Sequence, residues 1–128
     1  MIEVAAAIIE NDQELILIAR RKKGKSQQGM WEFPGGKLEP NESPEACLIR
    51  ELKEEMGIVI APHEQFGVNE HDYGDIQIRL IAYLANYSSG EIHLTDHDEF
   101  RWVERGKLLD YEWAPADIPF VKKLMSGN

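Results

Sequence analysis

The sequence of 128 residues lacks several features that mark particular classes of protein. It has one cysteine, Cys47, and therefore no internal disulfide. We expect Cys47 to be a small apolar residue of the core, and we expect the protein to occupy a reducing, cytoplasmic compartment. No apolar run approaches the ~20 residues of a membrane-spanning helix. Residues 1–10 have no basic flank of the kind that precedes a secretory signal. We therefore expect no membrane partner.

Positive charge is also scarce. The chain has 14 lysines and arginines against 23 aspartates and glutamates, which gives a formal net charge of −9 at pH 7. This balance argues against a broad surface for nucleic-acid polymers. It does not exclude a phosphorylated small molecule whose charge is offset by metal cations.

The length and the residue pattern predict a single domain over residues 1–128 of the α+β class. Alternating or continuous apolar segments predict strands over residues 2–9, 15–20, 75–84, 91–94 and 100–103. The first two strands should form a hairpin around Asn11-Asp12. A short helix is expected over residues 118–125.

One long helix is expected in the middle of the chain. Ser43 suits the N-cap and Pro44 the first helical position, while Gly57 suits the end of the helix. Between them, apolar residues recur at helical spacing, at Ala46, Ile49, Leu52 and Met56, which predicts that this face of the helix is buried.

The predicted helix also carries a dense group of acidic side chains. Glu51, Glu54 and Glu55 are spaced i, i+3 and i+4, so their carboxylates share one face. Such crowding is unfavourable unless a positive group neutralises it. Hard divalent cations such as Mg²⁺ or Mn²⁺ take carboxylate oxygens as ligands. From spacing alone, a solvated acidic face paired with Arg50 or Lys53 remains the alternative.

The whole stretch GGKLEPNESPEACLIRELKEEMGI, residues 35–58, resembles the Nudix box. Gly36, Glu42 and the run from Arg50 to Ile58 occupy every fixed position of that pattern. On this resemblance the chain is identified as a member of the Nudix hydrolases, which cleave nucleoside diphosphates linked to another moiety. The resemblance implies an α/β/α sandwich around a mixed β-sheet, with the box as a central loop–helix–loop.

The resemblance also implies roles for the matched positions. Glu54 and Glu55 would bind Mg²⁺ or Mn²⁺ with the backbone carbonyl of Gly35. Glu51 would bind metal or activate water, oriented by Arg50. The remaining matched positions would be structural: Gly36, Glu42 and Gly57.

Many members of the family carry a further carboxylate in a later loop. Here the segment TDHDEFRWV supplies Asp96, Asp98 and Glu99. Asp96-His97 resembles an acidic–histidine pair of related enzymes, so Asp96 is our first candidate for the general base outside the box and Glu99 the second. A solvated acidic turn before a strand is the alternative.

Three segments outside the box resemble the MutT-type branch, which hydrolyses nucleoside triphosphates: ARR (19–21), WEFPGGK (31–37) and APADIP (114–119). The last is most similar to the CTP pyrophosphohydrolase members. The resemblance implies that Arg21 and Lys37 meet phosphates. It also implies that Phe33 lies near the base and that Asp117 reads the edge of the base.

Asp117 stands where members that prefer 8-oxo-dGTP commonly have asparagine. An ionised carboxylate only accepts hydrogen bonds, so it favours a base edge that presents donors, such as an amino group. A buried, protonated Asp117 would donate instead and widen the range. Cytosine nucleotides and oxidised purine triphosphates both stay open. A purely structural role as N-cap of the last helix is the alternative.

These features predict a cytoplasmic, Mg²⁺-dependent diphosphatase, monomeric or homodimeric, that acts on small-molecule nucleotides. Water would attack the β-phosphorus of a (deoxy)nucleoside triphosphate and release a monophosphate and pyrophosphate. The expected role is sanitation of the nucleotide pool, which contributes to DNA repair, or control of a pyrimidine triphosphate. Hydrolysis of ADP-ribose or a dinucleoside polyphosphate is the rival reaction. A non-catalytic nucleotide sensor is the rival of another class, and the intact glutamate set of the box argues against it.

Overall fold

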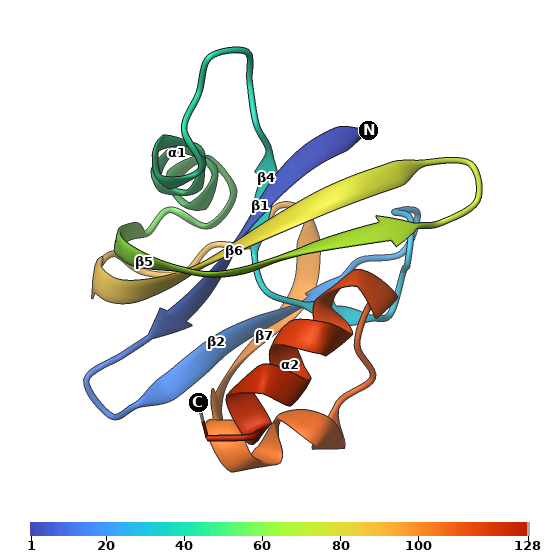
Figure 1. Cartoon of the computed structure of the whole chain (residues 1–128). Helices are drawn as coiled ribbons and strands as arrows, with labels where there is room; N and C mark the ends of the chain where they lie inside the picture. Colours follow the sequence, from blue (N-terminus) through green and yellow to red (C-terminus); the bar gives the residue numbers. More distant parts are fainter. Residues whose placement is uncertain (128) are drawn as a thin grey trace.

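The computed structural model describes residues 1–127 and shows a mixed β-sheet between two α-helices (Figure 1). In chain order the elements are β1 (Ile2–Glu10), β2 (Leu15–Arg21), β3 (Trp31–Glu32), β4 (Gly35–Lys37), α1 (Pro44–Met56), β5 (Val59–Asp72), β6 (Gln77–Ser89), β7 (His97–Glu104), two 3₁₀ segments, η1 (Arg105–Asp110) and η2 (Pro115–Asp117), and α2 (Ile118–Met125). The predicted α+β class and α/β/α sandwich are confirmed. Within the described residues, no helix is both long and apolar enough to cross a membrane.

The sheet opens beside its central strand, β1. Strand β6 pairs with β1 in parallel along its whole length, whereas β1 and β2 are in register only near their turn, at Glu10 and Ile16. Beyond this turn the two strands diverge, and the Pro34 carbonyl accepts a hydrogen bond from the Ala7 amide in the gap (2.8 Å). Strand β4 then pairs with β1, while β3 and β7 flank β2. The predicted hairpin therefore exists only at its turn, and its open end leaves room for a cavity.

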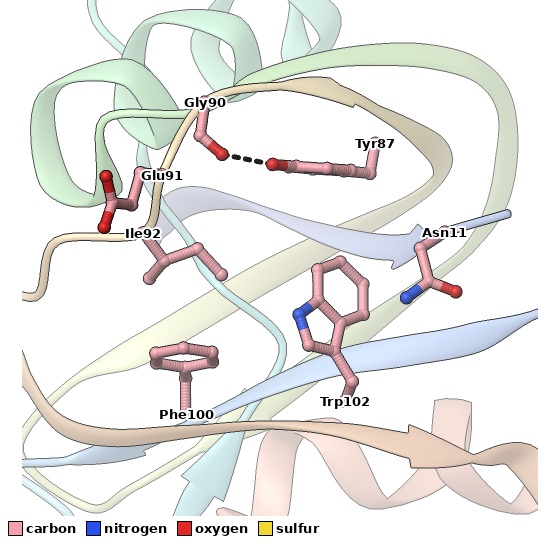
Figure 2. A pocket seen from close by; sticks show the side chains of 7 residues that line it. All are labelled: Asn11, Tyr87, Gly90, Glu91, Ile92, Phe100 and Trp102. Atoms are coloured by element: carbon pink, nitrogen blue, oxygen red, sulfur yellow. Dashed lines mark hydrogen bonds between the residues drawn. The ribbon is translucent and has the colours of Figure 1, made fainter. Parts of the chain in front are cut away.

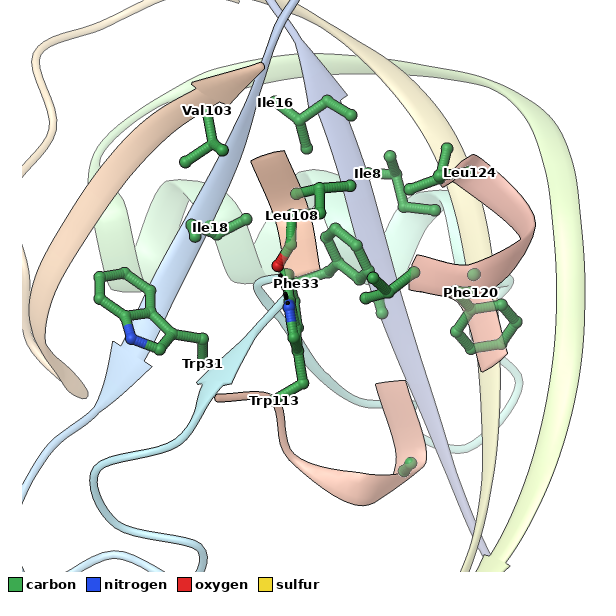
Figure 3. Packing of buried hydrophobic residues seen from close by; sticks show 14 of the residues in the cluster. Ile8, Ile16, Ile18, Trp31, Phe33, Val103, Leu108, Trp113, Phe120 and Leu124 are labelled. Carbon is green, nitrogen blue, oxygen red and sulfur yellow. Dashed lines mark hydrogen bonds between the residues drawn. The ribbon is translucent and has the colours of Figure 1, made fainter. Parts of the chain in front are cut away.

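Alternation along β1 divides its side chains between two hydrophobic cores. Ala6 and Ile8 face α2 and pack in a cluster with Phe120 and Leu124 (Figure 3). The intervening residues of β1 face α1, whose buried side chains are Cys47, Leu48, Leu52 and Met56. Burial of each large apolar side chain contributes about 1.5–3 kcal/mol. The cores thus fix both helices against the sheet.

The capping signals for α1 are confirmed, whereas its apolar face was only partly right: Leu52 and Met56 are buried, but Ala46 and Ile49 are exposed. The Ser43 hydroxyl accepts a hydrogen bond from the Ala46 amide (3.1 Å), and Pro44 begins the helix. Gly57 ends it with a φ of 70°, a left-handed conformation that costs glycine little. Cys47 is buried in this helix, and burial raises the pKa of its thiol to about 12, so it is an inert core residue.

Two expectations about strands were wrong. Residues 91–94 form no strand, because Ile92 and Leu94 pack against the core under α1 instead of pairing with a sheet edge. Strand β5 was missed, because Pro62 and Gly67 interrupt its pattern. It is an edge strand with three irregularities in its pairing with β6, and an edge tolerates such residues.

Candidate active site

Arg50 organises the acidic face of α1. Its guanidinium donates hydrogen bonds to Glu42 (2.8 and 2.9 Å), to Glu51 (2.7 Å), to Glu54 (3.3 Å) and to the Lys37 carbonyl (3.3 Å). The hydrogen bonds from Arg50 lower the pKa of Glu42 to about 2, so this carboxyl stays ionised. Glu42 is therefore an anchor for Arg50, which in turn orients Glu51.

The two glycines before α1 allow this helix to lie close to the sheet. A Cβ atom on Gly36 would stand 2.1 Å from a carboxylate oxygen of Glu51, and one on Gly35 would stand 1.9 Å from the Ala5 carbonyl oxygen. Either contact is far inside van der Waals distance. Gly36 thus leaves the space in which the Glu51 carboxylate lies, and Gly35 allows β4 to pair closely with β1.

A second acidic side chain of α1 reaches a distant loop. The carboxyl of Glu55 lies near Asp96 and Glu51, and burial together with these two neighbours raises its pKa to about 9. The same contact lowers the pKa of Asp96, which also pairs with Lys25 (3.3 Å). Three carboxyl groups from two segments are therefore neighbours, and this crowding favours a proton on Glu55 when no cation is bound.

This donor set fits a hard divalent cation. Glu51, Glu55 and Asp96 offer carboxylate oxygens, and their crowding is the arrangement that a cation relieves. Within residues 1–127, however, no three acidic, histidine or cysteine side chains already stand as ligands of one ion. Glu54 is turned outward to Arg50, with 60% of its side chain exposed.

Glu99, the second candidate in the later loop, lies elsewhere. Its carboxylate pairs with Arg20 (3.3 Å) and Arg101, and Asp98 also pairs with Arg20 (2.7 Å). The structure thus brings Asp96 to the box helix and holds Asp98 and Glu99 in ion pairs with strand arginines.

A cavity of about 930 Å³ opens beside the box, where β1 and β2 diverge. Its polar lining includes Arg21, Glu32, Lys37, Tyr73 and Asp117, and its apolar floor comes from β1 and β6. A smaller recess of about 90 Å³ shares several of these residues and extends to the box glycines. The predicted phosphate-binding and base-reading residues therefore line two adjoining spaces, and the smaller one extends to Gly35 and Gly36.

Asp117 lies deep in this cavity, with only 4% of its surface exposed. Its Oδ1 accepts a hydrogen bond from the Phe33 amide (3.0 Å), and burial together with nearby Glu32 raises its pKa well above the usual value. It precedes α2 but its side chain makes no capping hydrogen bond, so the N-cap alternative does not describe it. The hydroxyl of Tyr73, just after β5, accepts a hydrogen bond from the Ala116 amide (3.1 Å), and Asn69 of β5 donates one to the Ala116 carbonyl (3.0 Å).

Phe33 and Arg21 have less freedom than the sequence suggested. The Phe33 ring packs against Trp113, with the two ring centroids 4.7 Å apart, and Phe33 is 2% exposed. This residue therefore borders the recess from within the core. The Arg21 guanidinium makes two hydrogen bonds to the Glu32 carboxylate (3.0 and 3.1 Å) and others to Ser26.

The sequence-based predictions missed Glu32 and gave His97 no role of its own beyond its pairing with Asp96. Glu32 accepts hydrogen bonds from Arg21 and from His97 Nε2 (2.8 Å), and its carboxylate faces the cavity. A charged residue between two buried aromatics, Trp31 and Phe33, was the signal available for Glu32. His97 carried no comparable signal, since its partner is 65 positions away.

A second pocket, of about 360 Å³, lies between β7 and the loop after β6 (Figure 2). Tyr87, Phe100 and Trp102 form aromatic walls, and Glu91 is the one ionisable carboxylate in its lining. A triphosphate needs cationic partners, so the cavity beside the box is the better candidate for a nucleotide.

We expect Arg50→Lys to lower kcat by about tenfold, because a lysine cannot bridge Glu42 and Glu51 through a planar fork of donors. The unpaired carboxylates should also lower the melting temperature by several degrees. Steady-state kinetics and thermal unfolding check both effects. Lys53→Arg, on an exposed position of the same helix, is the control and should change neither; an Arg50→Lys variant equal to it would contradict the organising role.

The cation-free protein should lose stability as the pH rises. Because the pKa of Glu55 is raised from 4.5 to about 9, the folded state keeps a proton there that the unfolded chain has released. The resulting stabilisation is complete below the unfolded value and is lost as the pH rises through the folded value. Melting temperatures measured with EDTA should fall across this window, less so in Glu55→Gln, and added Mg²⁺ should raise them most at the alkaline end. Equal slopes for the two proteins would contradict this assignment.

Comparisons with known proteins agree with this geometry. A model described as the NUDIX domain matches residues 1–124. The chain is 40% identical over 126 residues to the CTP pyrophosphohydrolase of Escherichia coli (strain K12), which covers 98% of the chain and 93% of that protein. It is 35% identical over 126 residues to the 8-oxo-dGTP diphosphatase of Haemophilus influenzae, with the same coverage. The crystal structure of a MutT protein from Methanosarcina mazei Go1 is similar with a TM-score of 0.87 and 29% identity, over 99% of this chain and 94% of that one.

Proposed function

Since this chain belongs to the NUDIX family, we propose that it hydrolyses (deoxy)nucleoside triphosphates to a monophosphate and pyrophosphate. The observation that carries the proposal is a cavity lined by Arg21, Lys37 and Asp117, together with a recess that shares Arg21 and Asp117 and extends to Gly36, which lies against the Glu51 carboxylate. The names of the two relatives, CTP pyrophosphohydrolase and 8-oxo-dGTP diphosphatase, support the same reaction.

Nudix hydrolases generally use divalent metal ions, and we propose Mg²⁺ or Mn²⁺ here. When bound, the ion offsets phosphate charge and lowers the pKa of bound water. Glu51, Glu55 and Asp96 would hold it, together with the Gly35 carbonyl. Glu54 could join them only after its side chain turns away from Arg50.

The chemical step requires a proton acceptor beside the attacking water. The water oxygen bonds to the β-phosphorus, the bond from that phosphorus to the α,β-bridging oxygen breaks, and the nucleoside monophosphate leaves. Glu51 is the proposed acceptor of the water proton, because Arg50 and the Gly36 backbone fix its carboxylate. Asp96 is the rival, since it is ionised and meets Glu55. Glu99 could take part only after leaving its arginine partners.

The cavity suggests how the substrate is held. Lys37 and Arg21 would bind the phosphate tail, with Arg21 exchanging part of its contact with Glu32 for phosphate oxygens. Asp117, kept neutral by burial, can donate one hydrogen bond and accept another. Cytosine presents an acceptor, N3, beside an amino donor, N4, so Asp117 and Glu32 together fit that edge. Oxidised purine triphosphates are the second candidate substrates, because the chain is 35% identical to an 8-oxo-dGTP diphosphatase.

We propose one domain over the whole chain, monomeric or homodimeric, acting on free nucleotides in the cytoplasm. The test is pyrophosphate release from CTP, dCTP, dGTP, 8-oxo-dGTP, ATP, ADP-ribose and a diadenosine polyphosphate, with Mg²⁺, with Mn²⁺ or with EDTA. Cation-dependent pyrophosphate release, greatest from cytosine substrates, is the expected result. Turnover confined to ADP-ribose or the dinucleotide would overturn the proposal, and binding without any turnover would favour a nucleotide sensor.

A further inference from the structure

We propose that His97 is a positioning residue that fixes the Glu32 carboxylate against the nucleotide cavity. The inference rests on the proposed function, because it assigns Glu32 to the base of the substrate. His97 is 5% exposed, and its Nε2 lies 2.8 Å from the Glu32 carboxylate. A carboxylate only accepts hydrogen bonds from such a neighbour, so Nε2 carries the hydrogen and donates it.

The contact joins three adjacent strands. Glu32 belongs to β3, Arg21 to β2 and His97 to β7, and β2 lies between the other two. The pairing of β2 with β7 is irregular between Arg20 and Arg21, where His97 stands opposite Arg21. Glu32 is thus held from one side by Arg21 and from the other by His97.

The two donors differ in how firmly they are held. The Arg21 side chain is 26% exposed, lines the cavity and is expected to turn toward the phosphates. The His97 side chain is 3% exposed and has no room to leave. His97 therefore keeps Glu32 in place when Arg21 engages the substrate.

A count of acceptor sites shows what remains for the substrate. A carboxylate offers about four lone-pair sites, two on each oxygen. Oε2 of Glu32 accepts from both Arg21 and His97, whereas Oε1 accepts from Arg21 alone. The remaining site on Oε1 is available to an amino group of a base, in the same cavity as Asp117.

A buried imidazole with an unsatisfied nitrogen is less stable than an apolar side chain at the same position, unless the ring makes a contact that an apolar side chain cannot make. Among the described residues, its Nδ1 is the one buried side-chain nitrogen or oxygen that lacks a hydrogen-bond partner. An apolar residue would fill the position without leaving that nitrogen unsatisfied. The donor to Glu32 is the contribution that an apolar residue cannot make.

Two substitutions separate positioning from packing. The amide nitrogen of His97→Gln can occupy the place of Nε2, whereas that of His97→Asn is too short to do so. We expect KM for the preferred nucleotide to rise about 10–30-fold in His97→Asn, with kcat within about twofold, as for loss of a hydrogen bond to a charged group. His97→Gln should stay within about threefold of wild type in both constants. Equal effects of the two variants would overturn the proposal.

A double-mutant cycle tests the path through Glu32. In a Glu32→Ala background, His97→Asn should raise KM by less than about twofold, because the group to be positioned is gone. An undiminished effect there would overturn the proposal. The Mg²⁺ concentration for half-maximal activity should be the same in wild type and His97→Asn; a shift would mean that His97 acts through Asp96 instead.

A measurement without substrate distinguishes the failure of this inference from the failure of the proposed function. Long-range ¹H–¹⁵N spectra should show that the His97 ring carries a hydrogen at Nε2 and none at Nδ1. The chemical shift of Nε2 should change in Glu32→Gln. A ring protonated at Nδ1 alone would overturn the His97–Glu32 bond whatever the enzyme hydrolyses. Absence of turnover on every nucleotide, with the predicted spectrum, would overturn the proposed function and with it the role of Glu32 toward a base.

Discussion

Replacement of Glu51 by glutamine should lower kcat for nucleotide hydrolysis by about 10³-fold or more, the size expected when a positioned proton acceptor is removed. The amide keeps the shape of the side chain, so it should still fit against Gly36 and accept from Arg50. It removes the negative charge and the capacity to take a proton. Because Glu51 also crowds Glu55, its neutralisation should weaken cation binding as well.

The controls lie on the same helix and in the later loop. Glu45→Gln changes an exposed glutamate in the first turn of α1 and should leave kcat within about twofold. Asp96→Asn, assayed at saturating Mg²⁺, asks whether the base lies outside the box. Near-normal turnover by Glu51→Gln, with a large loss in Asp96→Asn, would transfer the role of proton acceptor to Asp96.

The box could be predicted from the sequence because its determinants are local. The cap at Ser43 and the left-handed Gly57 act within one segment, and each takes the expected place in the structure. The side-chain hydrogen bonds of Arg50 likewise join residues at most 13 positions apart along the chain. Local physics was sufficient there.

The cavity could not be predicted to the same extent, because its contacts join distant segments. The helical spacing predicted that Glu54 lies beside Glu51 and Glu55, yet Glu54 turns outward to Arg50. The neighbour of Glu55 is instead Asp96, from the loop that follows β5 and β6. Glu32 and His97 come together only because β3, β2 and β7 are neighbours in the sheet. This order of strands depends on the divergence of β1 from β2, which no pattern of residues in the sequence predicts.

Replacement of Asp117 by alanine should lower kcat/KM for the preferred nucleotide by about 10²-fold or more, because a site that reads polar groups discriminates strongly when one partner is removed. The substitution also removes the acceptor of the Phe33 amide, at 3.0 Å in the structure. That buried N–H would then lack a partner, at a cost of about 1–3 kcal/mol in unfolding free energy. Kinetics on CTP and dCTP and urea denaturation measure the two effects separately.

Asp117→Asn separates the charge of this side chain from its shape. Burial and the neighbouring Glu32 raise the pKa of Asp117, which favours the neutral acid, a group with one donor and one acceptor. Asparagine has the same pair, a carbonyl for the Phe33 amide and an NH₂ in place of the acid hydroxyl. We therefore expect Asp117→Asn to keep kcat/KM within about tenfold and to retain the order of base preference. If it lost as much as Asp117→Ala, an ionised Asp117 would be required, and the cavity would favour base edges that present two donors, such as N1 and N2 of guanine.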